Sequence, residues 1–310
     1  SGLGLRADET ALRAGLAMAG VPLEAISALV LTHAHPDHIG IAHRIHAKSG
    51  APIYMLPDEA ETLYTVWDRG FDGAVARLAD WYASNGLAPT EASLDTGVGT
   101  SFVGAGTGGA ENATATPMLP IRLPPRAAIH PVAEGQDLRL GRWSYHVYWT
   151  PGHADHHLCL LREDGLFFAG DHILPRITPN IGLYPHARPN PLGDYYASLG
   201  LVRDLPARLT LPGHGLPFAA LAQRVDELRR HHEERSATVA RLLTEASGQR
   251  QTRDGVDGAT VARALFGGRL HTRDDERFAL VETLAHLEYL YLAGKADRSE
   301  QDGPRRYCAN

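Results

Sequence analysis

Cysteine is nearly absent from this sequence of 310 residues, which contains only Cys159 and Cys308. We therefore expect no disulfide framework. The sequence also lacks an apolar run long enough to cross a bilayer and shows no secretory signal at its start, so we expect a cytoplasmic protein without a membrane partner. Basic residues do not outnumber acidic ones: 30 against 36 give a formal charge of −6. This balance argues against a nonspecific nucleic-acid binder.

Histidine, in contrast, occurs in an unusual pattern. The segment HAHPDH, residues 33–38, places three imidazoles and a carboxylate close together. It directly follows the apolar run 28–32, which is typical of a strand. A strand that ends in a turn can direct alternate side chains toward one point. His33 and His35 can therefore face one ion, while Asp37 and His38 turn toward another. These ligand types suit zinc and, less strictly, iron or manganese. Taken alone, the segment is also compatible with a histidine-rich surface turn.

Three further candidates follow a shared pattern of an apolar strand, a glycine and a ligand-type side chain. They are His153, Asp171 and His214, preceded by Gly152, Gly170 and Gly213. Glycine lets the backbone turn tightly and lets a metal ion approach closely. Together with the histidine segment, these motifs predict one shared metal site.

With these motifs the sequence resembles the metallo-β-lactamase-fold hydrolase superfamily over roughly its first two-thirds. The resemblance implies an α+β fold, namely a four-layer αββα sandwich with a site for two divalent metal ions at one edge. Zinc is the expected metal, with iron or manganese as alternatives. The resemblance assigns one ion to His33, His35 and His153, the other to Asp37, His38 and His214, and the bridging position to Asp171. It also implies a metal-bridging hydroxide as the nucleophile, and we expect Asp37 to act catalytically by orienting it and handling a proton.

Two domains are predicted. A catalytic domain is expected at residues 1–218, with a mobile glycine-rich insertion or lid at about 95–117, and a small helical domain at 219–310. The strands that relatives carry before the histidine segment are missing from the sequence, so we expect the sandwich to lack them. Regular secondary structure is predicted as helices at 221–246, 259–266 and 277–293, followed by a wing.

The small domain resembles the winged-helix tail found on one branch of the superfamily. Its last helix carries Glu282 and Glu288 and is a poor phosphate-binding face, so nucleic acid is not an expected partner. Packing or dimerisation is the expected role, and the sequence leaves open whether the protein is a monomer or a homodimer. The pair His231 and His232 lies in a charged run, and we predict that it faces solvent.

The substrate region is expected beyond Asp171. Asn180 and Tyr184 lie in a proline-rich loop and are predicted to donate hydrogen bonds to an oxygen of a small-molecule substrate. A rigid loop without substrate contact is the alternative. His157 and His172 are predicted to orient the metal ligands from behind.

The residue at the bridging position reduces the number of superfamily branches that the sequence resembles. The best-known antibiotic-hydrolysing branch has cysteine where this sequence has Asp171, so the sequence is more similar to the glyoxalase-II-like, lactonase, phosphodiesterase and nuclease branches. The leading prediction is a metal-dependent hydrolase of a small ester, thioester, lactone or phosphoester, with weak promiscuous β-lactamase activity. An endoribonuclease or phosphodiesterase, an iron-dependent sulfur dioxygenase and a non-catalytic scaffold are the alternatives.

Overall fold

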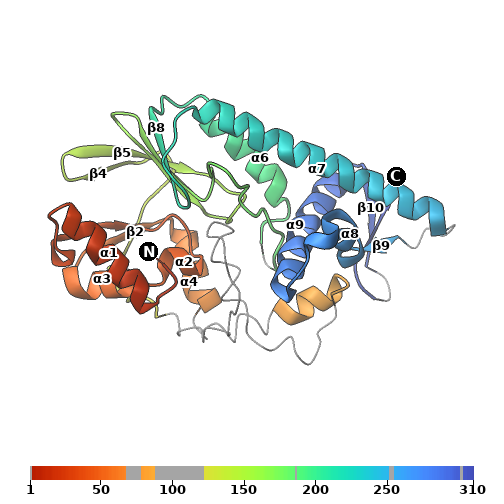
Figure 1. The fold of residues 1–310 in the computed structure, drawn as a ribbon, viewed down its shortest axis with the longest axis horizontal. Coiled ribbons are helices and arrows are strands. Elements are labelled where there is room, and N and C mark those ends of the chain that lie inside the picture. The colour runs from red at the N-terminus through yellow and green to blue at the C-terminus, as the bar shows by residue number, and fades with distance from the viewer. Residues whose placement is uncertain (1, 68–77, 88–121, 186, 251–254, 301–302) are drawn as a thin grey trace.

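The computed structural model describes residues 2–67, 78–87, 122–185, 187–250, 255–300 and 303–310 (Figure 1). These residues form helices and both parallel and antiparallel sheets, which confirms the predicted α+β class. The predicted glycine-rich lid at 95–117 lies outside the described residues. No helix in the described ranges combines the length and the apolar character that a membrane span requires.

The first sheet has three parallel strands in the order β1-β2-β3. Its strands are β1 (Leu29–Val30), β2 (Ile53–Met55) and β3 (Ile129–Pro131). The accompanying helices are α1 (Arg6–Met18), α2 (Pro36–Ile39), α3 (Ala42–Ser49) and α4 (Pro57–Trp67). Helix α3 ends at Gly50, which adopts the left-handed conformation (φ 69°) that glycine tolerates.

The second sheet has five strands in the order β4-β5-β6-β7-β8. They are β4 (Asp137–Leu140), β5 (Trp143–Trp149), β6 (Leu158–Arg162), β7 (Leu166–Gly170) and β8 (Leu209–Pro212). The neighbours pair antiparallel except for β7 and β8, which are parallel. Strands β5, β7 and β8 therefore run in one direction, and their carboxyl ends lie at one edge.

Apolar side chains alternate between the two faces of this second sheet, as the period of a strand requires. Val147, Leu158 and Leu160 face the first sheet and form a core between the sheets with Tyr54 and Val132. This core holds the two sheets face to face.

The outer faces of both sheets are covered by helices. Cys159 and Phe167 lie on the opposite face of the second sheet and pack against Tyr195 of helix α6 (Pro191–Val202). On the first sheet, α4 contributes Leu63 and Trp67 to a separate core. The order across the molecule is thus helices, sheet, sheet and helices.

The C-terminal elements are three helices and a small antiparallel sheet of order β10-β11-β9. They are α7 (Leu221–Arg250), β9 (Val256–Asp257), α8 (Gly258–Phe266), α9 (Arg273–Leu292), β10 (Ala296–Ser299) and β11 (Arg306–Ala309). The three predicted helices are confirmed. Helix α9 begins earlier than predicted because Thr272 and Asp275 form a capping box.

The largest core joins the C-terminal helices to the rest of the chain. It includes Leu199 of α6, Val225 and Leu228 of α7, and Leu284 of α9. Figure 1 shows α7 running from the second sheet to the C-terminal elements. The predicted domain boundary near residue 219 thus lies where packing is continuous, and the division into two domains stays a prediction.

The predicted exposure of His232 is wrong, because its side chain is 0% exposed. His232 shares one face of α7 with Val225, Leu228, Ser236 and Val239, which are also buried. These positions follow the three- and four-residue spacing of a helical stripe. In the sequence, the charged residues on either side of His232 make this buried stripe difficult to recognise.

Glu288 joins the small sheet to α9. Its carboxylate is 3% exposed and accepts a hydrogen bond from the Tyr307 hydroxyl at 2.6 Å. Arg298 of β10 pairs with the same carboxylate at 2.7 Å. A buried carboxylate needs such partners, because an unpaired charge is costly to bury.

We expect Tyr307→Phe to lower the free energy of unfolding by about 1–2 kcal/mol, since it removes one hydrogen bond to a buried charge. Chemical denaturation measures the change, with Tyr291→Phe as the control because Tyr291 is partly exposed. Equal stability of Tyr307→Phe and the unmodified protein would contradict this account of Glu288.

Candidate metal centre

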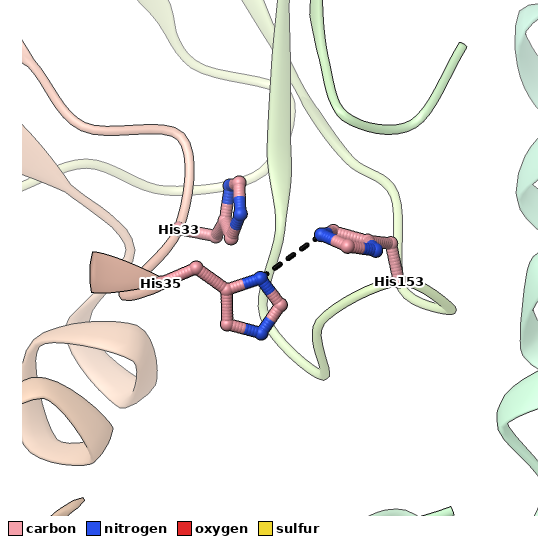
Figure 2. Close-up of side chains that lie close together, drawn as sticks. All are labelled: His33, His35 and His153. Carbon is pink, nitrogen blue, oxygen red and sulfur yellow. Dashed lines mark hydrogen bonds between the residues drawn. The ribbon is translucent and has the colours of Figure 1, made fainter. Parts of the chain in front are cut away.

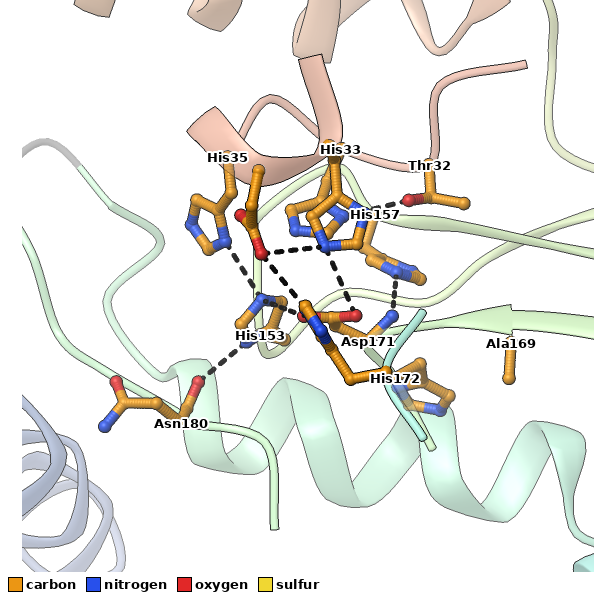
Figure 3. A network of polar contacts seen from close by, with 12 residues as sticks. Thr32, His33, His35, His153, His157, Ala169, Asp171, His172 and Asn180 are labelled. Carbon is orange, nitrogen blue, oxygen red and sulfur yellow. Dashed lines mark hydrogen bonds and ion pairs between the residues drawn. The ribbon is translucent and has the colours of Figure 1, made fainter. Parts of the chain in front are cut away.

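The predicted ligand side chains meet at one edge of the two sheets, although they come from separate segments of the chain. Strand β1 leads into the first segment, whose last two ligands lie on α2. The other segments follow β5, β7 and β8, whose carboxyl ends share an edge. Figure 3 shows the side chains from these segments converging. The structure brings together all the predicted ligands, namely His33, His35, Asp37, His38, His153, Asp171 and His214.

His33, His35 and His153 form the first group (Figure 2). Each offers a ring nitrogen within 4.8 Å of the others, and His35 Nδ1 lies 3.0 Å from His153 Nε2. Gly152 allows the turn before His153, since its φ is 141° and a Cβ there would lie 2.6 Å from the Cβ of Tyr195. The glycine of this motif is therefore required by both backbone conformation and packing.

Asp37, His38 and His214 form the second group. Asp37 Oδ2 lies 3.0 Å from His214 Nε2 and 3.5 Å from His38 Nε2. The Asp171 carboxylate lies between the groups. Its Oδ1 is 3.4 Å from His38 Nε2, and its Oδ2 is 3.4 Å from His214 Nε2 and 3.6 Å from His153 Nε2. One carboxylate thus reaches side chains of both groups, as a bridging ligand must.

Burial and proximity determine the protonation of these side chains. Burial lowers the pKa of His35 to about 3, so its ring is neutral at pH 7. Burial alone would raise the pKa of Asp171, but hydrogen bonds with His214 and His38 outweigh this effect and hold that pKa below its usual range. Hydrogen bonds to Asp171 and Asp37 raise the pKa of His214 to about 10. Imidazoles and ionised carboxylates together form a donor set for zinc, iron or manganese.

His33 shows that the centre fits a cation. Its side chain is 0% exposed, and its Nδ1 lies 3.0 Å from Thr32 Oγ1. Its Nε2 is buried and has no hydrogen-bond partner within the described ranges. Leaving a buried polar atom unpaired costs on the order of 1–3 kcal/mol, and a metal ion would satisfy it. The residues present therefore fit a metal ion.

Asn180 contacts the centre through its backbone. Its carbonyl accepts a hydrogen bond from His153 Nδ1 at 2.9 Å, which leaves His153 Nε2 unprotonated and facing the centre. Its amide Nδ2 lies 3.5 Å from the Phe278 carbonyl and 3.5 Å from Glu282 Oε2, and Figure 3 shows the amide directed away from the histidines. Tyr184 is partly buried, and burial raises the pKa of its hydroxyl. Substrate contacts by these two residues stay predictions.

The two histidines predicted to support the ligands are both fully buried, at 0% exposure. His157 Nε2 accepts a hydrogen bond from the Asp171 backbone N–H at 3.2 Å, and its Nδ1 lies 2.9 Å from Thr150 Oγ1. It therefore holds the backbone of the bridging residue. The ring of His172 packs edge-on against Tyr195, 5.2 Å between centroids, behind the centre.

The sequence did not point to Glu59, which fixes the histidine segment from α4. Glu59 is 2% exposed and accepts hydrogen bonds from the backbone N–H groups of Ala34, at 2.6 Å, and of His156. Trp67 donates its indole N–H to the Ala34 carbonyl at 2.8 Å. Burial raises the pKa of Glu59 to about 7. In the sequence Glu59 is indistinguishable from an ordinary acidic residue in the first turn of a helix.

Comparison with known families accounts for most of the chain. Residues 1–214 match the model of a family described as the metallo-beta-lactamase superfamily. Residues 251–310 match a model described as the metallo-beta-lactamase-like C-terminal domain. The first match spans the sandwich, and the second spans the end of the helical C-terminal part.

A crystal structure of a metallo-beta-lactamase family protein from Thermus thermophilus is similar to this chain along its length. The TM-score is 0.77 and the sequences are 29% identical, and the match covers 100% of this chain and 88% of that one. This similarity extends to the C-terminal helices and strands.

Among curated proteins, the chain is similar to the Bacillus subtilis protein named probable metallo-hydrolase YqjP, with 27% identity over 244 residues that cover 76% of this chain and 68% of that protein. It is also similar to the atrochrysone carboxyl ACP thioesterase of Aspergillus fumigatus, with 27% identity over 152 residues that cover 47% of this chain and 45% of that enzyme. The chain spans less than half the length of the fungal relatives it matches.

Gly213→Ala should damage the centre without replacing any of the predicted ligand residues. A Cβ at this position would overlap Asp171 Oδ1 and lie 2.9 Å from His38 Cε1. We expect zinc affinity, measured by competition with a chelator, to fall at least about 10-fold. Gly268→Ala is the control, because a Cβ there meets nothing within 4 Å. Equal affinities of the two variants would rule out this steric role.

Glu59 should make the free energy of unfolding depend on pH. Its folded pKa of about 7 lies above the ordinary value of 4.5, so the folded protein keeps a proton that the unfolded chain releases. The contribution of Glu59 to stability is therefore fully present below pH 4.5 and is lost as the pH rises to 7. This contribution falls by about 2–3 kcal/mol from pH 5 to pH 8.

Glu59→Gln should remove this component, so that the change in stability from pH 5 to pH 8 differs from that of the unmodified protein by about 2–3 kcal/mol. Denaturation at pH 5 and pH 8 in the presence of a chelator measures it without a contribution from metal binding. Asp58→Asn on the same helix, where the side chain is 75% exposed, should keep the original slope. A Glu59→Gln profile parallel to that of the unmodified protein would show that Glu59 does not titrate in this range.

Proposed function

The chain belongs to the metallo-beta-lactamase superfamily, and from this premise we propose that it is a hydrolase that holds two divalent metal ions and cleaves a small ester, thioester, lactone or phosphoester. The observation that carries the proposal is the Asp171 carboxylate, whose oxygens lie 3.4–3.6 Å from ring nitrogens of both ligand groups. A carboxylate in this position supports two neighbouring ions.

In this proposal, His33, His35 and His153 would hold one ion, and Asp37, His38 and His214 would hold the other. Asp171 would serve both. When bound, the ions would supply an activated water and polarise the carbonyl or phosphoryl group of the substrate. Zinc is the proposed metal, because structural and catalytic zinc sites use these ligand types at neutral pH.

The proposed roles of the protein groups around the metal ions are to accept a proton, to orient a metal ligand and to hold the substrate. Burial would raise the pKa of Asp37, but the hydrogen bond with His214 outweighs it and lowers that pKa, so the carboxylate is ionised. Asp37 Oδ2 is the proposed acceptor for the proton released during hydrolysis. Asn180 keeps His153 in the correct tautomer through its carbonyl, and Tyr184 is the proposed donor to a substrate oxygen.

A thioester is the first substrate class to test. The support is the fungal relative whose name describes an acyl-carrier-protein thioesterase. Hydrolysis of a thioester and of an ester needs the same polarised carbonyl, so both belong in one assay with a lactone and a bis-aryl phosphate.

The test is elemental analysis of protein purified without added metal, with the four hydrolysis assays on the same sample. We expect at least about two zinc ions per chain, two of which are lost in Asp171→Ala. In Asp171→Ala we expect loss of metal and a fall in kcat/KM of at least about 10³-fold, since metal stabilisation of the transition state contributes several kcal/mol. Asp204→Ala, whose side chain is 79% exposed, should retain both. About one iron per chain, with oxygen uptake and no hydrolysis, would overturn the proposal.

A further inference from the structure

A second cluster of ligand-type side chains lies between α7 and α9, apart from the centre described above. His232, Glu282 and His286 each offer one ligand atom, and these atoms lie within 4.8 Å of one another. The side chains of His232 and His286 are 0% exposed and that of Glu282 is 7% exposed. Two imidazoles and a carboxylate are rarely buried together unless they bind a cation or complete a hydrogen-bond network.

The helical spacing explains why these side chains meet. Glu282 and His286 are four residues apart on α9, and His232 and Ser236 are four residues apart on α7, so each pair lies on one helix face. The two faces are buried against each other. Metal sites in helical bundles are built in this way, from side chains at such spacing on facing helices.

The distance between the two imidazoles fits a shared ion better than a hydrogen bond. His232 Nδ1 and His286 Nε2 are 3.5 Å apart, which is long for a hydrogen bond between nitrogens. Two nitrogens bound at 2.0–2.1 Å to a tetrahedral zinc ion stand about 3.3 Å apart. The rings thus need to move by only about 0.2 Å to share one ion.

Neighbouring side chains contact His286 and Glu282 and hold them in position. Ser236 Oγ lies 2.8 Å from His286 Nδ1, so the hydroxyl can orient this ring and leave Nε2 as the ligand atom. Arg235 forms an ion pair with one oxygen of Glu282.

The ligand types at the cluster favour a transition metal over calcium or magnesium. Burial lowers the pKa of His232 to about 3 and that of His286 well below its usual range, so both rings are neutral ligands at pH 7. A site with two neutral imidazoles and one carboxylate suits zinc or a similar ion, whereas calcium and magnesium prefer several oxygen ligands.

We propose that His232, Glu282 and His286 form a separate structural site for zinc or a similar divalent transition metal that fastens α9 to α7. The site also lies directly behind the candidate catalytic centre. Glu282 Oε2 is 3.5 Å from Asn180 Nδ2, and the Asn180 carbonyl accepts the hydrogen bond from His153. An ion held here would therefore fix the helix against which Asn180 rests. The proposal does not depend on the hydrolase activity.

The test uses the full chain with the catalytic centre disabled by His33→Ala, Asp171→Ala and His214→Ala together. After removal of metal by a chelator, Co²⁺ and Zn²⁺ are titrated separately. We expect this background to bind one equivalent, to show the visible absorption of four-coordinate Co²⁺, and to melt at a higher temperature with Zn²⁺. Adding Glu282→Gln or His286→Gln should abolish all three effects.

Two further variants keep the test decisive if those substitutions prevent folding. Ser236→Ala removes only the hydrogen bond to His286, and we expect it to weaken Zn²⁺ binding about 10-fold or more. His231→Gln removes the adjacent, partly exposed imidazole and should leave binding unchanged. If the background binds no metal, or binds it equally well in Ser236→Ala and His231→Gln, the cluster is a buried polar network and the proposal is wrong.

Results with the intact protein separate the two proposals. Three equivalents of metal, reduced to about two by His286→Gln, would support both. One equivalent that requires His286 but not Asp171 would support the structural site and reject the binuclear hydrolase centre. Metal that requires Asp171 and is unaffected by His286→Gln would reject the structural site alone.

Discussion

The backbone N–H of Leu158 donates a hydrogen bond to the Thr32 carbonyl at 2.9 Å, and the arrangement of the metal centre depends on this contact between the sheets. Thr32 immediately precedes the histidine segment, and Leu158 begins β6, directly after the loop that carries His153. The contact therefore places ligands of the first sheet beside those of the second. The remaining ligands arrive because β5, β7 and β8 end at the same edge. Backbone topology thus determines where the ligands meet.

A centre of this kind requires buried polar groups, which are unfavourable without hydrogen-bond partners. Neighbouring side chains and backbone groups supply these partners. Glu59 accepts the N–H of Ala34, His157 accepts the N–H of Asp171, and the Asn180 carbonyl accepts the ring N–H of His153. Each partner leaves the metal-facing atoms of the ligands unoccupied, because each binds a backbone group or the opposite ring nitrogen. These contacts orient the ligands without competing with an ion.

The C-terminal helices share a continuous core with the helices that cover the second sheet. Helix α9 packs in the largest core with α6 and α7. Glu282 of α9 lies against Asn180, and the Asn180 carbonyl accepts the hydrogen bond from His153. The same helix carries Glu288, which is tied to Arg298 and Tyr307 of the small sheet. Burying both glutamates gives α9 a structural role.

The fold class, the family and the side chains that gather at the candidate metal centre could be predicted from the sequence, because each candidate ligand sits in a local pattern of strand, turn and ligand-type residue. The burial of His232, the role of Glu59 and the use of the Asn180 backbone could not be predicted without the folded structure. His232 is buried because its face of α7 meets α9, far away in the sequence. Glu59 matters because α4 packs beneath the histidine segment. Such contacts depend on which surfaces meet in the folded chain, and a local pattern carries no information about the surface that will cover it.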